Sequence, residues 1–570
     1  MISCQEAGSG AHAADACREN GRWRVNRRWR ATGPSPPRPP VRLVTLLVLV
    51  AAAAVGAGVR VWQVGGRAGL AWSDTADFLA GSAAPWLSLE LWAGERPPAA
   101  PVLLKVVGGD ADAYVVWQAA IAVACWAALA TSVFTVVAGR RARWLAALVV
   151  LGFSVTAPVA MWERSVLSES LAISLMALVV AAGLQVARGV TGWRVAALLV
   201  ALALWLATRD SHAAVALVGG AAVAAVATIS WLRSFGRRRA ESWDDAEERG
   251  GSELCDDPDV PGESEVADAG GSIAERRWLA ALGLGAVALG LVVGLASSYG
   301  ERHAFPMRNV YAVRVLPYAD RVRWFADHGM PQADEFVGPD ARAPYVEPGG
   351  PPVVYVADDD ARLRQWLDWV GTDGRRAFAE FVATHPLYLV SEPLRSPERA
   401  FNNAHGDRQF YTPPDMPTVP LVDRMLALPT IVVLVIAEIV GGWAFGRRRW
   451  SPALVVGVVT AGLAVPHGLV AWHSDGMETA RHLVVPAVQL HVGVLLMVLG
   501  TLRAEVDAPM SAGVPTEVVP RAGAARLAAR DPRSPATSGV DDDLESSDHG
   551  HDAIEHPPRA RQRRVRSANG

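Results

Sequence analysis

The stretch LVTLLVLVAAAAVGAGVRVWQVGGRAGLAWSDTADFLA, residues 43–80, decides the fold class of this chain. Residues 43–62 are predominantly apolar, and about 20 such residues are what a helix needs to cross a bilayer. Two carboxylates, Asp74 and Asp77, follow the apolar run beside Trp72 and Phe78. The stretch therefore predicts a membrane-spanning helix that leads into an acidic segment at the membrane surface.

Similar apolar runs recur along the whole chain. With 570 residues, 51% of them hydrophobic, and a mean hydropathy of +0.20, the sequence is too apolar for an ordinary soluble enzyme. We expect an all-α polytopic membrane protein with about ten transmembrane helices, within a range of about nine to eleven. The runs lie near 43–62, 113–138, 143–161, 167–187, 194–208, 212–232, 278–298, 428–446, 452–472 and 482–502.

Arginine clusters predict the orientation of these spans. With the N-terminus in the cytoplasm, the clusters GRRARW (139–144), RSFGRRR (233–239) and GRRR (446–449) all fall on the cytoplasmic side. The short outward loops carry isolated arginines, each beside a carboxylate or a histidine. We therefore expect a multi-pass protein of the plasma membrane with both termini in the cytoplasm.

Composition divides the chain into five parts. The polar termini, 1–40 and 503–570, are expected to be disordered cytoplasmic tails. An N-terminal transmembrane module, 41–298, includes an outer loop at 63–112, expected to be catalytic, and a linker at 233–275, acidic over 240–274, which we expect to be disordered in the cytoplasm. Residues 299–427 form a small extracytoplasmic segment between spans seven and eight, and 428–502 form a C-terminal transmembrane module.

The four cysteines have neither zinc-ligand nor CxxC spacing, so they predict no metal or redox site. Asp74 and Asp77 are the first candidates for chemistry, because an i, i+3 pair shares one side of a helix. Such carboxylates can accept a proton from a hydroxyl group, or hold a divalent cation. The alternative is that they cap a helix at the membrane interface, a role that suits the sequence SDTAD.

Three further outer loops bring carboxylates together with arginine or histidine. Ionisable groups near the membrane surface usually face a cavity and pair with one another. For the loop that contains Glu163 and Arg164, the alternative is a plain Glu–Arg pair that closes a helical hairpin. Together the loops meet the requirements of an anionic lipid headgroup, since arginine binds phosphate with a two-pronged fork. The candidate binding residues are Glu163, Arg164, Glu169, Arg209, His212, Glu478, Arg481 and His482.

The pattern resembles the GT-C type of membrane glycosyltransferase, in the group of protein O-mannosyltransferases and aminoarabinose transferases. The matching stretches are WSDTADF (72–78), ERPPAAPVLL (95–104), ERSVLSESLAISL (163–175), LATRDSH (206–212) and ETARHLVVP (478–486). The helix pattern is similar over roughly 43–500, whereas the specific likeness is confined to these stretches. The linker and the segment 299–427 depart from that group, which leaves the acceptor open.

The resemblance implies a catalytic base at Asp74 or Asp77, of which we favour Asp74. It also implies a polar site at Glu163 and Arg164. Arg481 and His482, near the C-terminal end of the helix pattern, would by this resemblance hold the lipid phosphate. The expected partners are a polyprenyl-phosphate sugar donor, a cell-envelope glycan, lipid or protein acceptor, and membrane lipids, with no nucleic acid and no cofactor beyond the cation left open above. The alternatives are a lipid or sugar transporter and a non-catalytic protein of envelope assembly.

Overall fold

The computed structural model describes residues 41–137, 139–249, 264–300, 302, 304–333, 364–395, 433, 435–437, 451–474 and 479–501. Within these residues the regular structure is helical, apart from a single isolated bridge between Leu70 and Ser165. Helices satisfy all their backbone polar groups internally, as a bilayer requires. The described residues therefore form an all-α protein of the multi-pass membrane type, as predicted.

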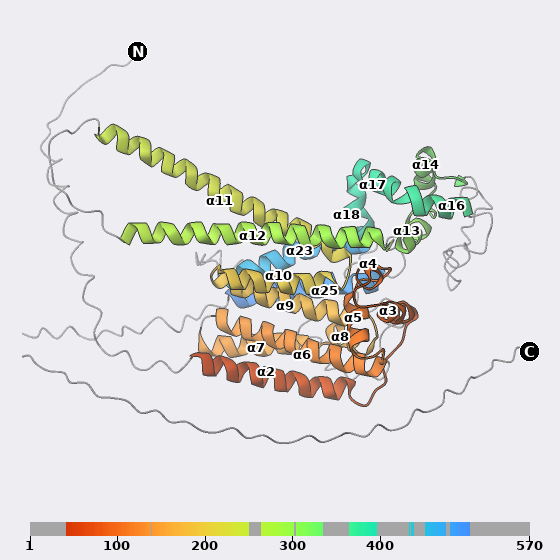
Figure 1. Cartoon of the computed structure of the whole chain (residues 1–570), viewed down its shortest axis with the longest axis horizontal. Coiled ribbons are helices and arrows are strands. Elements are labelled where there is room, and N and C mark those ends of the chain that lie inside the picture. Colours follow the sequence, from red (N-terminus) through yellow and green to blue (C-terminus); the bar gives the residue numbers. More distant parts are fainter. Residues whose placement is uncertain are drawn as a thin grey trace, which may run out of the picture. The chain divides into compact units, whose positions relative to one another are not determined.

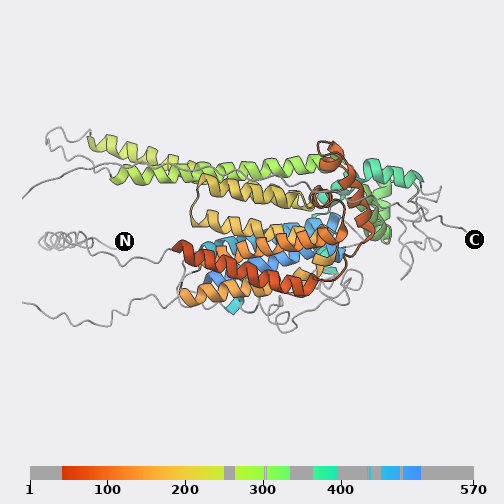
Figure 2. The ribbon, with the colours of Figure 1, turned by 60° about the horizontal axis from the view of Figure 1, so that its bottom comes forward.

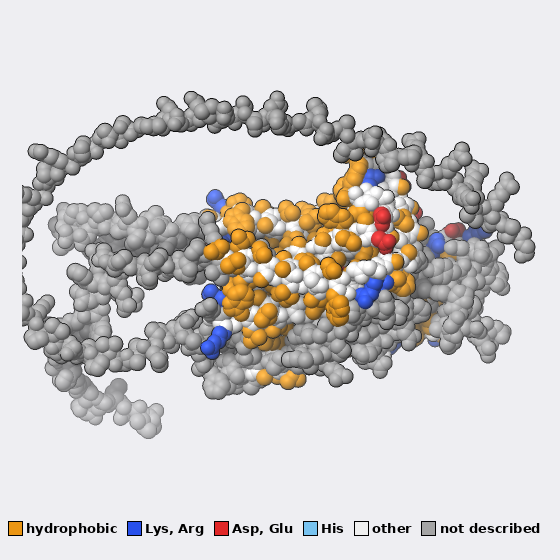
Figure 3. Space-filling view, turned by 90° about the horizontal axis from the view of Figure 1, so that it is seen from below, with side chains coloured by type: hydrophobic (Ala, Val, Ile, Leu, Met, Phe, Trp, Pro, Cys, Tyr) orange, Lys and Arg blue, Asp and Glu red, His pale blue; other side chains and the backbone are white. Residues whose placement is uncertain are grey.

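Among the described residues, nine of the helices form a bundle. Its members run along a common direction (Figure 1). They are α2 (Val41–Val64), α6 (Ala111–Val136), α7 (Arg140–Ser154), α9 (Glu169–Arg188), α10 (Gly192–Leu206), α11 (Ser211–Arg249), α12 (Ser264–Tyr299), α23 (Pro452–Ser474) and α25 (Val484–Thr501). On one face of the bundle apolar side chains cover the middle, while basic side chains gather toward both ends and acidic side chains toward one of them (Figure 3). That distribution suits a helix bundle surrounded by lipid.

The expectation of about ten spans is wrong for the residues that the structure describes. Six of their helices are long and apolar enough to cross a membrane, or seven if the pair Arg141–Ser154 and Ala157–Arg164, bent by 55°, is one span. Helix α10 and the stretch Val484–Gly500 are apolar but shorter. A helix rises about 1.5 Å per residue, so such lengths fall short of a hydrocarbon core about 30 Å thick. The expected span at 428–446 lies almost entirely outside the described residues.

The short elements gather at one end of the bundle, which we call the site end (Figures 1 and 2). The loop after α2 contributes α3 (Ser73–Ala83), α4 (Leu89–Ala93) and α5 (Ala99–Val106). The bend after α7 contributes α8 (Ala157–Ala160) and the 3₁₀ turn η1 (Met161–Arg164), and α24 (Thr479–His482) precedes α25. The loops that the sequence predicts on one side of the membrane thus do lie at one end of the bundle.

The described part of 299–427 has a core of its own. Its elements are α13 (Ala304–Val310), η2 (Tyr311–Val315), α14 (Ala319–Asp327), α16 (Arg364–Trp369), η5 (Val370–Gly374), α17 (Arg375–Thr384) and α18 (Pro386–Arg395). Tyr311, Phe325 and Trp366 are fully buried in an aromatic cluster. Two π-helical turns meet where the Tyr311 hydroxyl donates to the carbonyl of Gly374 at 2.8 Å. In other proteins, π-helical turns are frequent at functional sites.

Helices α11 and α12 extend into the segment for which the sequence predicts a disordered linker. Helix α11 continues to Arg249 and α12 begins at Ser264, so helix occupies 233–249 and 264–275. Arginine, glutamate and alanine recur in these two stretches and are good helix formers, which is why helix rather than irregular chain is found there. Residues 250–263, like the expected tails 1–40 and 503–570, lie outside the described residues.

Candidate functional site

The segment after α2 is anchored before it reaches Asp74. The amide of Leu70 donates to the carbonyl of Arg164 at 2.7 Å, and the amide of Val166 donates back to Leu70 at 3.0 Å. At the start of α3, the Thr75 hydroxyl accepts from the amide of Trp72 at 2.8 Å and donates to the carbonyl of Val166 at 3.1 Å. These bonds fix the first turn of α3, which carries Asp74, against the chain that leads into α9.

That chain runs from the end of η1 through irregular backbone at 165–168, and α6 satisfies several of its carbonyl groups. The Gln118 amide donates to the carbonyls of Glu163 and Ser165 at 2.6 and 2.9 Å. The Tyr114 hydroxyl donates to the carbonyl of Leu167 at 2.8 Å. Buried backbone outside a helix needs such partners. Helix α6 thereby determines where α9 begins, and its first residue is Glu169.

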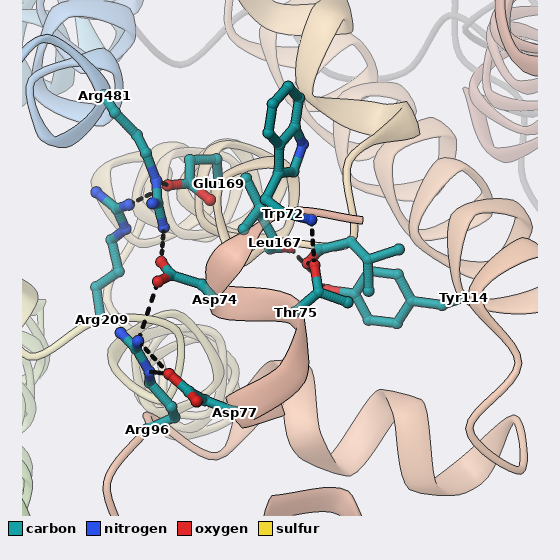
Figure 4. Close-up of polar contacts among 11 residues, drawn as sticks. Trp72, Asp74, Thr75, Asp77, Arg96, Tyr114, Leu167, Glu169, Arg209 and Arg481 are labelled. Atoms are coloured by element: carbon teal, nitrogen blue, oxygen red, sulfur yellow. Dashed lines mark hydrogen bonds and ion pairs between the residues drawn. The ribbon is translucent and has the colours of Figure 1, made fainter. Parts of the chain in front are cut away.

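Asp74 and Asp77 both contact arginine (Figure 4). Asp74 Oδ1 lies 3.0 Å from Arg96 Nη2, and Asp74 Oδ2 lies 2.6 Å from Arg481 Nη2. Asp77 Oδ2 accepts from the same Arg96 Nη2 at 2.5 Å and from Nε at 3.2 Å. The two aspartates share one side of α3, as predicted, and Arg96 joins them.

Glu169 completes the network from inside the bundle. It is fully buried, and one of its oxygens forms ion pairs with Arg209 and with Arg481. Arg481 therefore bridges Glu169 and Asp74, which lie on α9 and α3 (Figure 4). Three carboxylates and three guanidinium groups from distant parts of the sequence meet in this arrangement, which we call the ionic network: Asp74, Asp77, Arg96, Glu169, Arg209 and Arg481.

The charges within the network set the protonation state of Asp74. Burial raises the pKa of Asp74, but the positive charges of Arg481 and Arg96 outweigh it, so the pKa lies below the usual aspartate value. Burial lowers the pKa of Arg96, and its two aspartate neighbours raise it above the ordinary arginine value. Asp74 is thus a carboxylate at neutral pH, able to accept a proton once an arginine partner moves to another anion.

The other predicted residues are distributed around the network. Glu163 Oε1 lies 2.9 Å from Arg60 Nη1 on α2, and both side chains are buried. The Arg164 guanidinium donates to the carbonyl of Ala68 at 3.2 Å. The structure thus pairs Glu163 with Arg60 of α2, whereas the resemblance implies a site that Glu163 and Arg164 form together. Arg164 instead supports the segment that leads to Asp74.

The remaining predicted binding residues are His212, His482 and Glu478, and they differ in their surroundings. His212 stacks on Trp205 with 3.9 Å between ring centroids, and His467 meets it edge-on at 5.0 Å. His212 therefore faces an aromatic stack inside the bundle, and its placement among the substrate-binding residues stays a prediction. His482 is half-buried, and its charge acts on both Asp74 and Glu169. Glu478 lies outside the described residues.

Arg96 was not among the predicted site residues, although it lies in ERPPAAPVLL (95–104), one of the stretches that carry the resemblance. The available signal was an arginine in the same outer loop as Asp74 and Asp77, within ERPP. Tyr114 and Gln118 were not predicted either, although polar side chains within an apolar helix are the kind of residue that marks a function.

The arrangement suits exchange between carboxylate and phosphate. Arginine binds phosphate oxygens as readily as carboxylate oxygens, so an entering phosphate can take over Arg481 and Arg209. Within the described ranges, no group of three or more His, Cys, Asp or Glu side chains is arranged to hold a metal ion. No protein family model matches this sequence, and neither a curated protein nor a solved structure matches it.

Proposed function

We propose that this protein is a membrane glycosyltransferase of the GT-C type. It moves a sugar from a polyprenyl-phosphate-linked donor to an extracytoplasmic glycan, lipid or protein acceptor. The observation that supports the proposal is the bridge that Arg481 makes between Asp74 and the buried Glu169 at the site end. It joins a carboxylate base to a cationic site within an apolar bundle, where a lipid-borne phosphate would arrive.

In the proposed reaction, the donor phosphate binds Arg481 and Arg209, and this frees Asp74 from one of its partners. Asp74 then takes the proton of the acceptor hydroxyl, whose oxygen attacks the anomeric carbon of the sugar. The bond between that carbon and the phosphate oxygen breaks, and polyprenyl phosphate leaves with the electron pair. The two arginines stabilise the leaving phosphate. A single displacement inverts the anomeric centre, and the stereochemistry of the product checks this.

The first experiment uses membranes that contain the full-length protein and a labelled polyprenyl-phosphate sugar, without nucleotide sugar. Wild type is compared at equal expression with Asp74→Asn and Asp77→Asn. We expect Asp74→Asn to reduce label transfer by about a hundredfold or more, the usual contribution of a positioned base. Asp77→Asn should reduce it less, because that carboxylate acts through Arg96.

Glu90→Gln is the matched control, since Glu90 is an exposed carboxylate of α4 in the same outer loop. Its rate should equal that of wild type. Transfer that survives both aspartate substitutions would remove Asp74 and Asp77 from the mechanism. Absence of transfer by wild type, across several sugars and acceptors, would contradict the proposal as a whole.

A specific observation favours the second candidate, a non-catalytic protein of envelope assembly. Both oxygens of Asp74 already bind arginine, as they would in a purely structural network. On that hypothesis Asp74→Asn lowers thermal stability while wild type transfers no label. Because Asp74→Asn is expected to lower stability on either hypothesis, label transfer is compared per amount of folded protein, and a loss of transfer that exceeds the loss of folded protein separates catalysis from structure.

A further inference from the structure

Arg302, just beyond the end of α12, makes contacts that join two halves of the site end. Its Nε donates to the carbonyl of Gly94 at 2.5 Å, and its Nη2 donates to the carbonyl of Trp92 at 3.3 Å. Its Nη1 forms an ion pair with Asp210 Oδ1 at 2.9 Å. One nearly buried guanidinium thus binds the C-terminal end of α4 and the turn between α10 and α11 at once.

A second, independent observation places the end of α12 against the same loop. A side-chain carbon at Gly300 would collide with the carbonyls of Ala93 and Gly94. Glycine therefore allows the backbone to approach close enough for Arg302 to reach both carbonyls. We call this arrangement the clamp: the backbone at Gly300 lies against Ala93 and Gly94, and Arg302 binds the carbonyls of Trp92 and Gly94.

The clamp lies next to the ionic network on both sides. Two residues beyond Gly94, Arg96 binds Asp74 and Asp77. One residue before Asp210, Arg209 binds Glu169. Since a guanidinium fork fixes direction as well as distance, Arg302 sets the separation of the Arg96 and Arg209 backbones.

We propose that Arg302 is a positioning residue, which holds the loop that carries Arg96 against Asp210 and so keeps the Arg96 guanidinium beside Asp74. Its effect on the geometry stands by itself, and its effect on sugar transfer rests on the proposed function. Lysine cannot replace it, because a single ammonium cannot bind two carbonyls and a carboxylate in these directions.

The first test is a double-mutant cycle on the melting temperature of the full-length protein in detergent, with Arg302→Gln and Asp74→Asn. If Arg302 acts through Arg96 on Asp74, the loss caused by Asp74→Asn shrinks to roughly half in the Arg302→Gln background. Arg302→Lys and Gly300→Ala should behave like Arg302→Gln. The control cycle uses Arg323→Gln, an exposed arginine of α14, and should be additive. Additive losses in the Arg302 cycle would overturn the proposal.

Hydrogen exchange gives a second measurement that needs no activity. In Arg302→Gln, amides in residues 88–96 should exchange about tenfold faster, the factor that roughly 1.4 kcal/mol represents. Unchanged exchange in these residues would contradict the clamp. Both measurements apply even if wild type transfers no sugar, so the failure of the proposed function and the failure of the clamp are distinguishable.

Where transfer is observed, its pH profile gives a readout that lost folding does not imitate. The charges of Arg481 and His482 on α24 and of Arg96 in the loop after α4 lower the pKa of Asp74. Asp77 on α3 and Glu169 on α9 share its arginine partners. Loosening Arg96 removes one positive charge, so the acid limb of the profile should move to higher pH in Arg302→Gln. A uniform loss of rate at every pH, with no movement of that limb, would reject a role through Asp74.

Discussion

At the residue scale, Asp74 depends on the arginines around it. Its folded-state pKa lies below the ordinary value because Arg481 and Arg96 outweigh its burial. A carboxylate of this kind stabilises the fold at pH values above its unfolded pKa, about 3.9. That stabilisation is lost as the pH falls through the lower folded-state pKa. The network therefore couples folding to the ionised form of the proposed base.

Asp74→Asn should accordingly destabilise the protein at pH 7 by about 1–3 kcal/mol, the contribution of hydrogen bonds to charged groups. The difference from wild type should begin to shrink below about pH 4, where Asp74 of the unfolded chain takes up a proton, and it should vanish below the lower folded-state pKa. Thermal unfolding in detergent at pH 7 and at pH 3 measures this. An equal loss of stability at both pH values would contradict the ionised state assigned to Asp74.

The sequence could predict which residues gather at the site end, but only part of how they pair. Asp74, Glu169 and Arg481 come together as their outer positions suggest. Arg209, in the break between α10 and α11, binds Glu169, whereas His212 in the first turn of α11 stacks on Trp205. Pairing depends on such breaks and turns, which apolar periodicity does not encode.

At the scale of elements, the apolar runs located the helices well because length and hydropathy determine them directly. The packing between helices depends instead on small residues, since lipid provides little hydrophobic drive for helices to associate. Helices α23 and α25 illustrate this. A side-chain carbon at Gly493 would meet the backbone and side chain of Ala461 at 2.5–2.9 Å.

Gly493→Ala should therefore destabilise the protein by about 1–3 kcal/mol, because the two backbones must move apart. Gly462 on α23 is the matched control, since a side-chain carbon there has no neighbour within 4 Å. Gly462→Ala should be neutral or slightly stabilising, as alanine is the better helix former. The melting temperatures of Gly493→Ala and Gly462→Ala, each compared with wild type in detergent, measure this difference. Equal effects would mean that α23 and α25 do not pack as closely as described.

At the scale of the whole molecule, the predicted outer loops do gather at one end of the bundle (Figure 1). The number of full-length spans was harder to predict. Residues 143–161 read as one continuous run, yet the helix bends by 55° near Thr156 and Ala157. Proline at Pro158 suits the first turn of a new helix, and hydropathy alone did not separate the two pieces.

Orientation is the prediction on which the proposed function depends most, since a polyprenyl-phosphate donor on the outer face requires Asp74 to lie outside. We place single cysteines at Glu90, exposed on α4 at the site end, and at Thr191, exposed before α10 at the opposite end. Native Cys4, Cys17, Cys125 and Cys255 are first replaced by serine. A membrane-impermeant maleimide should label Glu90→Cys in intact cells and Thr191→Cys after permeabilisation alone. The reverse pattern would place the ionic network in the cytoplasm, where a carboxylate base at Asp74 could not act on an acceptor of the cell envelope.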